Sequence, residues 1–113
     1  MPRPVLDPRQ ARTFYNVADA LVAGSADLDL VPWVEKELAG RSRAERRAVR
    51  CFLRWIEWQP VLQLRCLRGF SWLSPQDRRD LLAAWEHSRL RVRRQAVGRL
   101  AALIREGYSR LGA

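Results

Sequence analysis

The chain has 113 residues, of which 48% are apolar and 29% charged, and its formal net charge at pH 7 is +9. The apolar content and the five tryptophans argue against intrinsic disorder, and the length suits a single helical domain over residues 1–113. The positive charge favours an anionic partner. Every basic residue except Lys36 is an arginine, however, and the arginines are spread along the chain, so a solvated surface of mixed charge is the alternative.

Two features bear on the compartment of the protein. Residues 1–10 contain three prolines and lack the apolar core of a secretory signal, and no segment approaches the roughly 18 apolar residues of a membrane span. We therefore expect a cytoplasmic protein, with export only alongside a partner that carries a signal. In such a chain we expect Cys51 and Cys66 to be buried thiols rather than a disulfide.

Capping signals predict an all-α fold, a single compact bundle of five to six helices, with residues 1–7 as an extended segment before the first helix. Asp7 and Pro8 open that helix, because the carboxylate accepts free amides and Pro has no amide to lose there. Gly24 and Ser25 end it. Its apolar face repeats at helical spacing: Phe14, Val17, Ala18, Leu21 and Val22.

The middle of the chain predicts a short helix and then a longer one. The short helix is closed by Gly40, and its inward residues are Val31, Val34 and Leu38. Ser42 and Glu45 form a capping box that opens the longer helix. The residues that this helix buries are Val49, Phe52, Leu53 and Ile56. Pro60 predicts a break or kink near Gln59, after which residues 61–67 could resume as a short helix.

Two further helices are predicted in the last third of the chain. Ser74 and Pro75 open the first, with Asp77 and Asp80 in the early turns that the helix dipole favours. Its apolar residues are Leu81, Leu82 and Trp85. Ser88 is the candidate N-cap of the final helix. That helix is expected to bury Val92, Ala96, Leu100, Leu103 and Ile104, with Val97 and Tyr108 at the margins.

The sequence lacks the residue sets that enzymes and metal sites need. Its single histidine, His87, suits a helix end or the surface better than catalysis. Cys51 and Cys66 have neither the spacing nor the companion ligands of a zinc site. Glu35 and Glu37 are interpreted as solvated helix residues rather than a catalytic pair. We expect no catalytic, metal-binding or cofactor-binding residue, and no enzyme activity of this chain alone.

Several aromatic residues and one cluster of arginines are not needed to form the core of a helical bundle. Trp55 and Trp58 flank Ile56, so both cannot be equally buried, and Trp72 precedes a helix cap. Partly exposed aromatic side chains are typical anchors of protein interfaces, although Trp72 could equally belong to a satellite core. The predicted partner-binding residues are Trp58, Phe70, Trp72, Arg89, Arg91, Arg93 and Arg94.

The four arginines of this set would crowd the positive end of the last helix if Ser88 caps it. Arg89 and Arg93 would also be like charges four residues apart on one helix. This unfavourable placement of positive charge indicates that acidic residues of a partner offset it. The planar guanidinium is well suited to binding carboxylates. Simple solvation, with acids such as Glu86 nearby, is the alternative.

One segment resembles a known family. The pattern Phe70-x-x-Leu73-Ser74-Pro75-x-Asp77-Arg78, followed by Leu82-x-x-Trp85-x-x-Ser88-Arg89, is similar to the gluconate dehydrogenase small (third) subunit family. A similar helical region precedes the flavin domain of long-chain alcohol oxidases of the glucose–methanol–choline class. Residues 18–27, ADALVAGSAD, resemble that family's "DALVPG"-type turn, with Ala23 where Pro is common. The resemblance covers residues 12–108.

The resemblance implies an accessory subunit without catalytic activity, which binds and stabilises a separate FAD-containing subunit that oxidises sugars or alcohols. FAD would then belong to the partner, and Leu73, Leu82, Trp85 and Ser88 would fix the helix pair. Many members carry a twin-arginine export signal, from which this sequence departs. Three alternatives remain: a nucleic-acid-binding protein that uses the arginine-rich last helix, a peripheral membrane adaptor that uses exposed Trp and Arg, and an unrelated helical interaction module.

Overall fold

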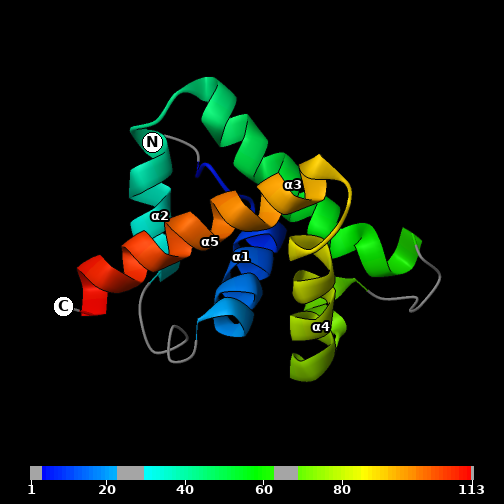
Figure 1. Ribbon diagram of the computed structural model, residues 1–113. Helices are drawn as coiled ribbons and strands as arrows, with labels where there is room; N and C mark the ends of the chain where they lie inside the picture. The colour runs from blue at the N-terminus through cyan, green and yellow to red at the C-terminus, as the bar shows by residue number, and fades with distance from the viewer. Residues whose placement is uncertain (1–3, 23–29, 63–68, 113) are drawn as a thin grey trace.

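The computed structural model describes residues 4–22, 30–62 and 69–112, and it shows an all-α protein (Figure 1). Its elements are α1 (Pro8–Leu21), α2 (Leu30–Ala39), α3 (Arg43–Leu62), the short 3₁₀ helix η2 (Phe70–Trp72), α4 (Pro75–Glu86) and α5 (Arg91–Gly112). Within the described ranges, five α-helices form a compact bundle, as predicted, and there is no strand. None of the helices in these ranges is both long and apolar enough to cross a membrane.

The predicted helix starts are largely confirmed. Asp7 accepts the amide of Gln10 at 2.7 Å, and the Gln10 side chain accepts the amide of Asp7 at 3.0 Å, which makes a complete capping box for α1. Ser74 caps α4 by accepting the amide of Asp77 at 3.2 Å. Ser42 accepts the amide of Glu45 at 3.2 Å, whereas the Glu45 carboxylate pairs with Arg41. The hydroxyl half of that predicted box is therefore present at the start of α3.

The core is one cluster of apolar side chains drawn from all five α-helices. α1 contacts every other helix, and Phe14 and Val17 on its inner face are almost completely buried. Phe70 adds a buried ring from η2, and Trp85 of α4 packs edge-on against Trp55 of α3, with ring centroids 4.8 Å apart. The helical periodicity of the sequence therefore identified most of the core correctly.

The predicted start of α5 is wrong, and α3 is not broken near Gln59. α3 continues through Pro60 to Leu62, because Pro60 falls in the last turn and removes only one backbone donor there. α5 begins at Arg91, and the carbonyl of Leu90 accepts the first helical amides, those of Arg93 and Arg94. Ser88 accepts the amide of Leu90 at 3.2 Å and thus stabilises the preceding turn instead of capping the helix.

Several predicted burial states also need correction. Val92 is 51% exposed because it lies in the first turn of α5, ahead of the buried Ala96, whereas Val97 is buried rather than marginal. Phe52 is only half-buried. Cys51 is an exposed free thiol on the outer face of α3. Cys66, the Gly24–Ser25 turn and the helix predicted beyond residue 62 lie outside the described residues.

Glu35 and Glu37 are half-buried and engaged, contrary to their interpretation as solvated residues. Glu35 accepts the amides of Val5 and Leu6 at 2.7 and 2.8 Å, which ties the segment before α1 to α2. Glu37 accepts a hydrogen bond from Arg41 at 3.1 Å. Both carboxylates therefore join segments of the fold.

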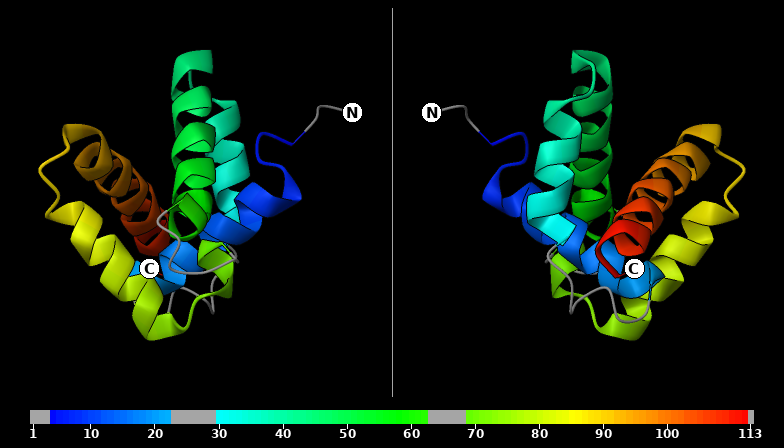
Figure 2. Two further views of the ribbon diagram at one scale, coloured as in Figure 1. Left: turned by 90° about the vertical axis from the view of Figure 1, so that its right-hand side faces the viewer. Right: turned by 90° about the vertical axis from the view of Figure 1, so that its left-hand side faces the viewer.

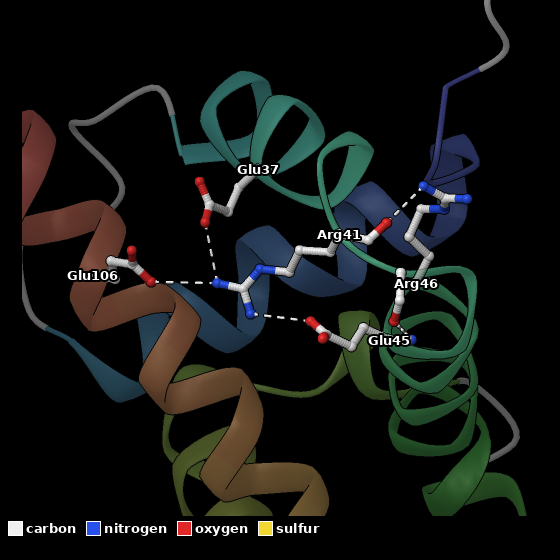
Figure 3. A network of polar contacts seen from close by, with 6 residues as sticks. Glu37, Arg41, Glu45, Arg46 and Glu106 are labelled. Atoms are coloured by element: carbon white, nitrogen blue, oxygen red, sulfur yellow. Dashed lines mark hydrogen bonds and ion pairs between the residues drawn. The ribbon is translucent and has the colours of Figure 1, made fainter.

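Arg41 connects three helices (Figure 3). Besides Glu37 of α2, it pairs with Glu45 of α3 and Glu106 of α5, each at 3.5 Å. The hydrogen bond with Glu37 raises the pKa of Arg41, the charges of the three carboxylates add to the rise, and burial opposes it. Arg46 donates to the carbonyl of Arg41 at 2.9 Å and so helps to close the turn after α2.

Candidate partner-binding surface

A groove of about 590 Å³ lies between the start of α1, the second half of α3 and η2. Its lining residues come from three segments of the chain: Asp7, Arg9, Gln10, Arg12 and Thr13; Arg54, Glu57 and Trp58; and Gly69, Ser71 and Trp72. We call this surface the groove. It contains two of the predicted partner-binding residues, Trp58 and Trp72.

Glu57 joins the three segments that line the groove. Its half-buried carboxylate accepts the hydroxyl of Thr13 at 2.8 Å and the amide of Ser71 at 3.1 Å, together with the Ser71 hydroxyl. A side chain at Gly69 would stand only 2.6 Å from the backbone carbonyl of Glu57, so the close approach of η2 to α3 requires glycine there. η2 is therefore held against α1 and α3 by one carboxylate.

A second support reaches η2 from α4. Arg78 donates to the carbonyl of Ser71 and, at 3.2 Å, to the side-chain oxygen of the buried Asn16 in α1. Ser71 is thus bound through its amide, hydroxyl and carbonyl. Because Trp72 is the next residue, its backbone is held by the same contacts.

Trp58 and Trp72 remain substantially exposed while lining the same groove. Their side chains are 48% and 61% exposed, respectively, although they come from different elements fourteen positions apart in the sequence. The sequence identified both as candidate anchors, and the structure brings them together. Two large, partly exposed aromatic side chains on a fixed backbone are typical of interface anchors.

Three arginines of the groove were missed by the sequence analysis. Arg9, Arg12 and Arg54 are exposed, and none forms an ion pair with any residue that the structure describes. Their spacing carried a usable signal, because Arg9 and Arg12 are three apart in α1, and Arg54 and Trp58 are four apart in α3. Only the packing of α1 against α3 shows that the two pairs share one surface.

Of the four arginines in the predicted cluster, one packs against the protein and three are exposed. Arg93 is half-buried, with its guanidinium 5.5 Å from the ring centre of Trp85, so its charge has a partner inside the chain. The other three are exposed beside two exposed apolar side chains. We call this surface the α4–α5 corner: Arg89, Leu90, Arg91, Val92 and Arg94.

Phe70 is wrong as a partner contact. Its ring is completely buried in the core, where η2 meets α1 and α3. The exposed aromatic group of η2 is Trp72. His87 lies, as predicted, at the surface on the C-terminal cap of α4.

The groove and the α4–α5 corner are separate surfaces. Figure 2 shows the start of α1 on one side of α3 and the turn between α4 and α5 on the other, in both views. The structure therefore does not combine the predicted tryptophans and arginines into one site. It pairs the tryptophans with Arg9, Arg12 and Arg54 instead.

The fold and the groove define an all-α protein with an aromatic, cationic surface hollow. Within the described ranges, no group of three or more His, Cys, Asp or Glu side chains could hold a metal ion. No protein-family model, no curated protein and no solved structure significantly matches the chain.

Proposed function

We propose that this chain is an accessory subunit that binds and stabilises an FAD-dependent oxidoreductase of the glucose–methanol–choline type, acting on sugars or alcohols. The observation that supports a binding role is the meeting of Trp58 and Trp72 at one groove. The kind of partner comes from the sequence resemblance over residues 12–108. In this proposal the chain itself has no catalytic role, and FAD is held by the partner.

The exposed tryptophan surface is large enough to drive association. A tryptophan buries about 200 Å² when fully covered, so each of these side chains has on the order of 100 Å² left to bury. At about 25 cal/mol per Å², covering that area is worth roughly 2.5 kcal/mol per side chain before the costs of association. An exposed ion pair contributes only ~0–1 kcal/mol. The tryptophans would supply most of the affinity, and the arginines would select the partner.

The residues that the resemblance marks as structural occupy positions that suit that role. Leu82 and Trp85 are buried and Leu73 is half-buried, so they join α4 to the core. The Ser88 hydroxyl orders the turn into α5. These positions agree with the accessory-subunit proposal.

A second candidate function is nucleic-acid binding through the α4–α5 corner. It is favoured by the exposure of Arg89, Arg91 and Arg94, which form no ion pair among the described residues. Binding to phosphates would weaken linearly with the logarithm of salt concentration, with a slope of about −0.9 for each phosphate contacted on duplex DNA. Binding at the groove would instead depend on Trp58 and Trp72.

Co-expression with a flavoprotein encoded beside this chain, followed by tag purification and visible absorption spectroscopy, tests the proposal. We expect a complex that carries flavin absorption bands and that is lost in Trp72→Ala. The matched control is the double variant Arg91→Glu with Arg94→Glu, which should retain the complex. A colourless protein that elutes alone would refute the accessory role, and strong absorbance at 260 nm would favour nucleic acid.

A further inference from the structure

We infer that the groove receives an extended acidic segment of a protein, with carboxylates that pair with Arg9, Arg12 and Arg54 and an apolar residue between Trp58 and Trp72. The inference rests on the proposed function only in assigning that segment to the flavoprotein subunit. It gives the groove a specific kind of occupant.

The charges of the groove lining favour carboxylates in the bound partner. Arg9, Arg12 and Arg54 are exposed and have no ionic partner among the described residues. The two acids of the lining are engaged within the chain, Asp7 with the amide of Gln10 and Glu57 with Thr13 and Ser71. The three guanidinium charges outnumber the two carboxylate charges, so the lining carries a net charge of +1. Guanidinium groups bind carboxylates through two parallel hydrogen bonds, which makes them selective for such partners.

The two carboxylates of the groove lining favour a peptide over a nucleic-acid backbone. Glu57 and Asp7 present carboxylate oxygens, and each carboxylate can accept about four hydrogen bonds. A peptide backbone offers N–H donors to the spare positions while its acidic side chains reach the arginines. A phosphodiester backbone has no such donors. The groove therefore combines donors and acceptors in the way an extended peptide requires.

The support beneath the groove favours binding without rearrangement. Ser71 is held by Glu57 and Arg78, so Trp72 has a fixed backbone before any partner arrives. Less conformational entropy is lost on binding to a surface that is already ordered. The segment would meet a preformed site, with the indole rings as its apolar walls.

Fluorescence anisotropy with labelled synthetic probes tests this inference. The probes are a short peptide in which Asp and Glu alternate with Leu, its Asn and Gln analogue, and oligothymidylate of similar length. We expect the acidic peptide to bind at least ~10-fold more tightly than the amide analogue, a difference of about 1.4 kcal/mol. Arg12→Glu with Arg54→Glu should weaken its binding by at least ~10-fold. Arg91→Glu with Arg94→Glu, the matched charge change at the corner, should alter it less than ~3-fold.

Three results would overturn the inference: equal binding of the amide analogue, tighter binding of oligothymidylate, or no binding of the acidic peptide. Loss of binding only in the corner variant would overturn it too. Circular dichroism and thermal unfolding show whether each variant is folded, and the milder Arg54→Gln replaces any that is not. If the flavoprotein co-purifies through Trp72 but the peptide does not bind, this inference fails and the proposed function stands. If the acidic peptide binds but no flavoprotein co-purifies, the proposed function fails and this inference stands.

Discussion

The groove and the α4–α5 corner are both cationic and both carry exposed apolar side chains, yet they differ in how firmly they are built. In the groove, Glu57 and Arg78 hold Ser71, and through it the backbone beside Trp72. In the corner, Arg91 and Arg94 project from the first turn of a helix whose dipole they oppose. A surplus of arginine in a sequence thus does not distinguish a supported site from an exposed helix start.

This difference suggests different roles in association. A preformed aromatic surface lowers the cost of ordering and sets how long a complex lasts. Exposed charges away from the contact mainly raise the rate of encounter and make it sensitive to salt. We expect the groove to determine the dissociation rate and the α4–α5 corner, at most, the association rate.

The largest expected effect is on binding by Trp72→Ala. Removing this side chain should weaken binding of the flavoprotein or the acidic peptide by about 2 kcal/mol, or ~30-fold, mostly through faster dissociation. The corner variant Arg91→Glu with Arg94→Glu should change only the association rate. Surface plasmon resonance at two salt concentrations measures both rates. If the corner variant dissociated faster than Trp72→Ala, the α4–α5 corner and not the groove would determine the lifetime of the complex.

The next largest expected effect is the loss of stability when Glu57, which binds Thr13 and Ser71, is replaced. Glu57→Ala leaves the hydroxyl of Thr13 and the amide of Ser71 without their acceptor, so the free energy of unfolding should fall by about 1–3 kcal/mol. Glu86→Ala removes an exposed carboxylate of α4 and should change it by no more than ~0.5 kcal/mol. Urea unfolding followed by circular dichroism compares the two variants. Equal stabilities would show that Glu57 does not hold η2 in place.

Within the arginine cluster, Arg93 should differ from Arg94. Arg93→Ala removes the guanidinium over Trp85 and should destabilise the fold by about 1 kcal/mol, within the range for a partly buried cation–π contact. Arg94→Ala should be nearly neutral, because its exposed side chain has no partner among the described residues. Thermal unfolding of both variants checks this order, and a larger loss for Arg94→Ala would contradict it.

The smallest expected effect is a gain in stability at the corner. Arg91→Glu and Arg94→Glu each replace a cation near the positive end of α5 with an acid, which should stabilise the protein by ~0.3–1 kcal/mol at low salt. The gain should shrink as salt is added, because salt screens exposed charges. Thermal unfolding at low and high salt measures it. A loss of stability in both variants would show that these arginines have partners within the chain.

The sequence was sufficient for features that depend on neighbouring residues. The caps at Asp7 and Ser74 involve hydrogen bonds over three positions, and the buried faces follow the helical period. The start of α5 was placed wrongly because Ser88 can satisfy a local amide without opening the helix, and it does so at Leu90. The residues around Ser88 are compatible both with a helix cap and with a turn before the helix.

The groove could not be predicted because it depends on distant contacts. Glu57 reaches Thr13 across 44 positions and Ser71 across 14, and neither contact has a sequence signature. Phe70 and Trp72 show the same limit, since η2 turns one ring into the core and exposes the other only two positions later. The sequence identified Trp72 as an anchor but could not identify the arginines beside it.

The most direct test uses the tryptophans as reporters during titration with the acidic peptide. In ¹⁵N-labelled protein, indole N–H signals distinguish the two groove tryptophans, Trp58 and Trp72, from the packed pair, Trp55 and Trp85. We predict large shifts for Trp58 and Trp72, with little change for Trp55 and Trp85 or for the backbone amides of Leu90 and Val92. Shifts confined to Leu90 and Val92, with the groove indoles unchanged, would contradict the claim that the groove is the partner-binding surface.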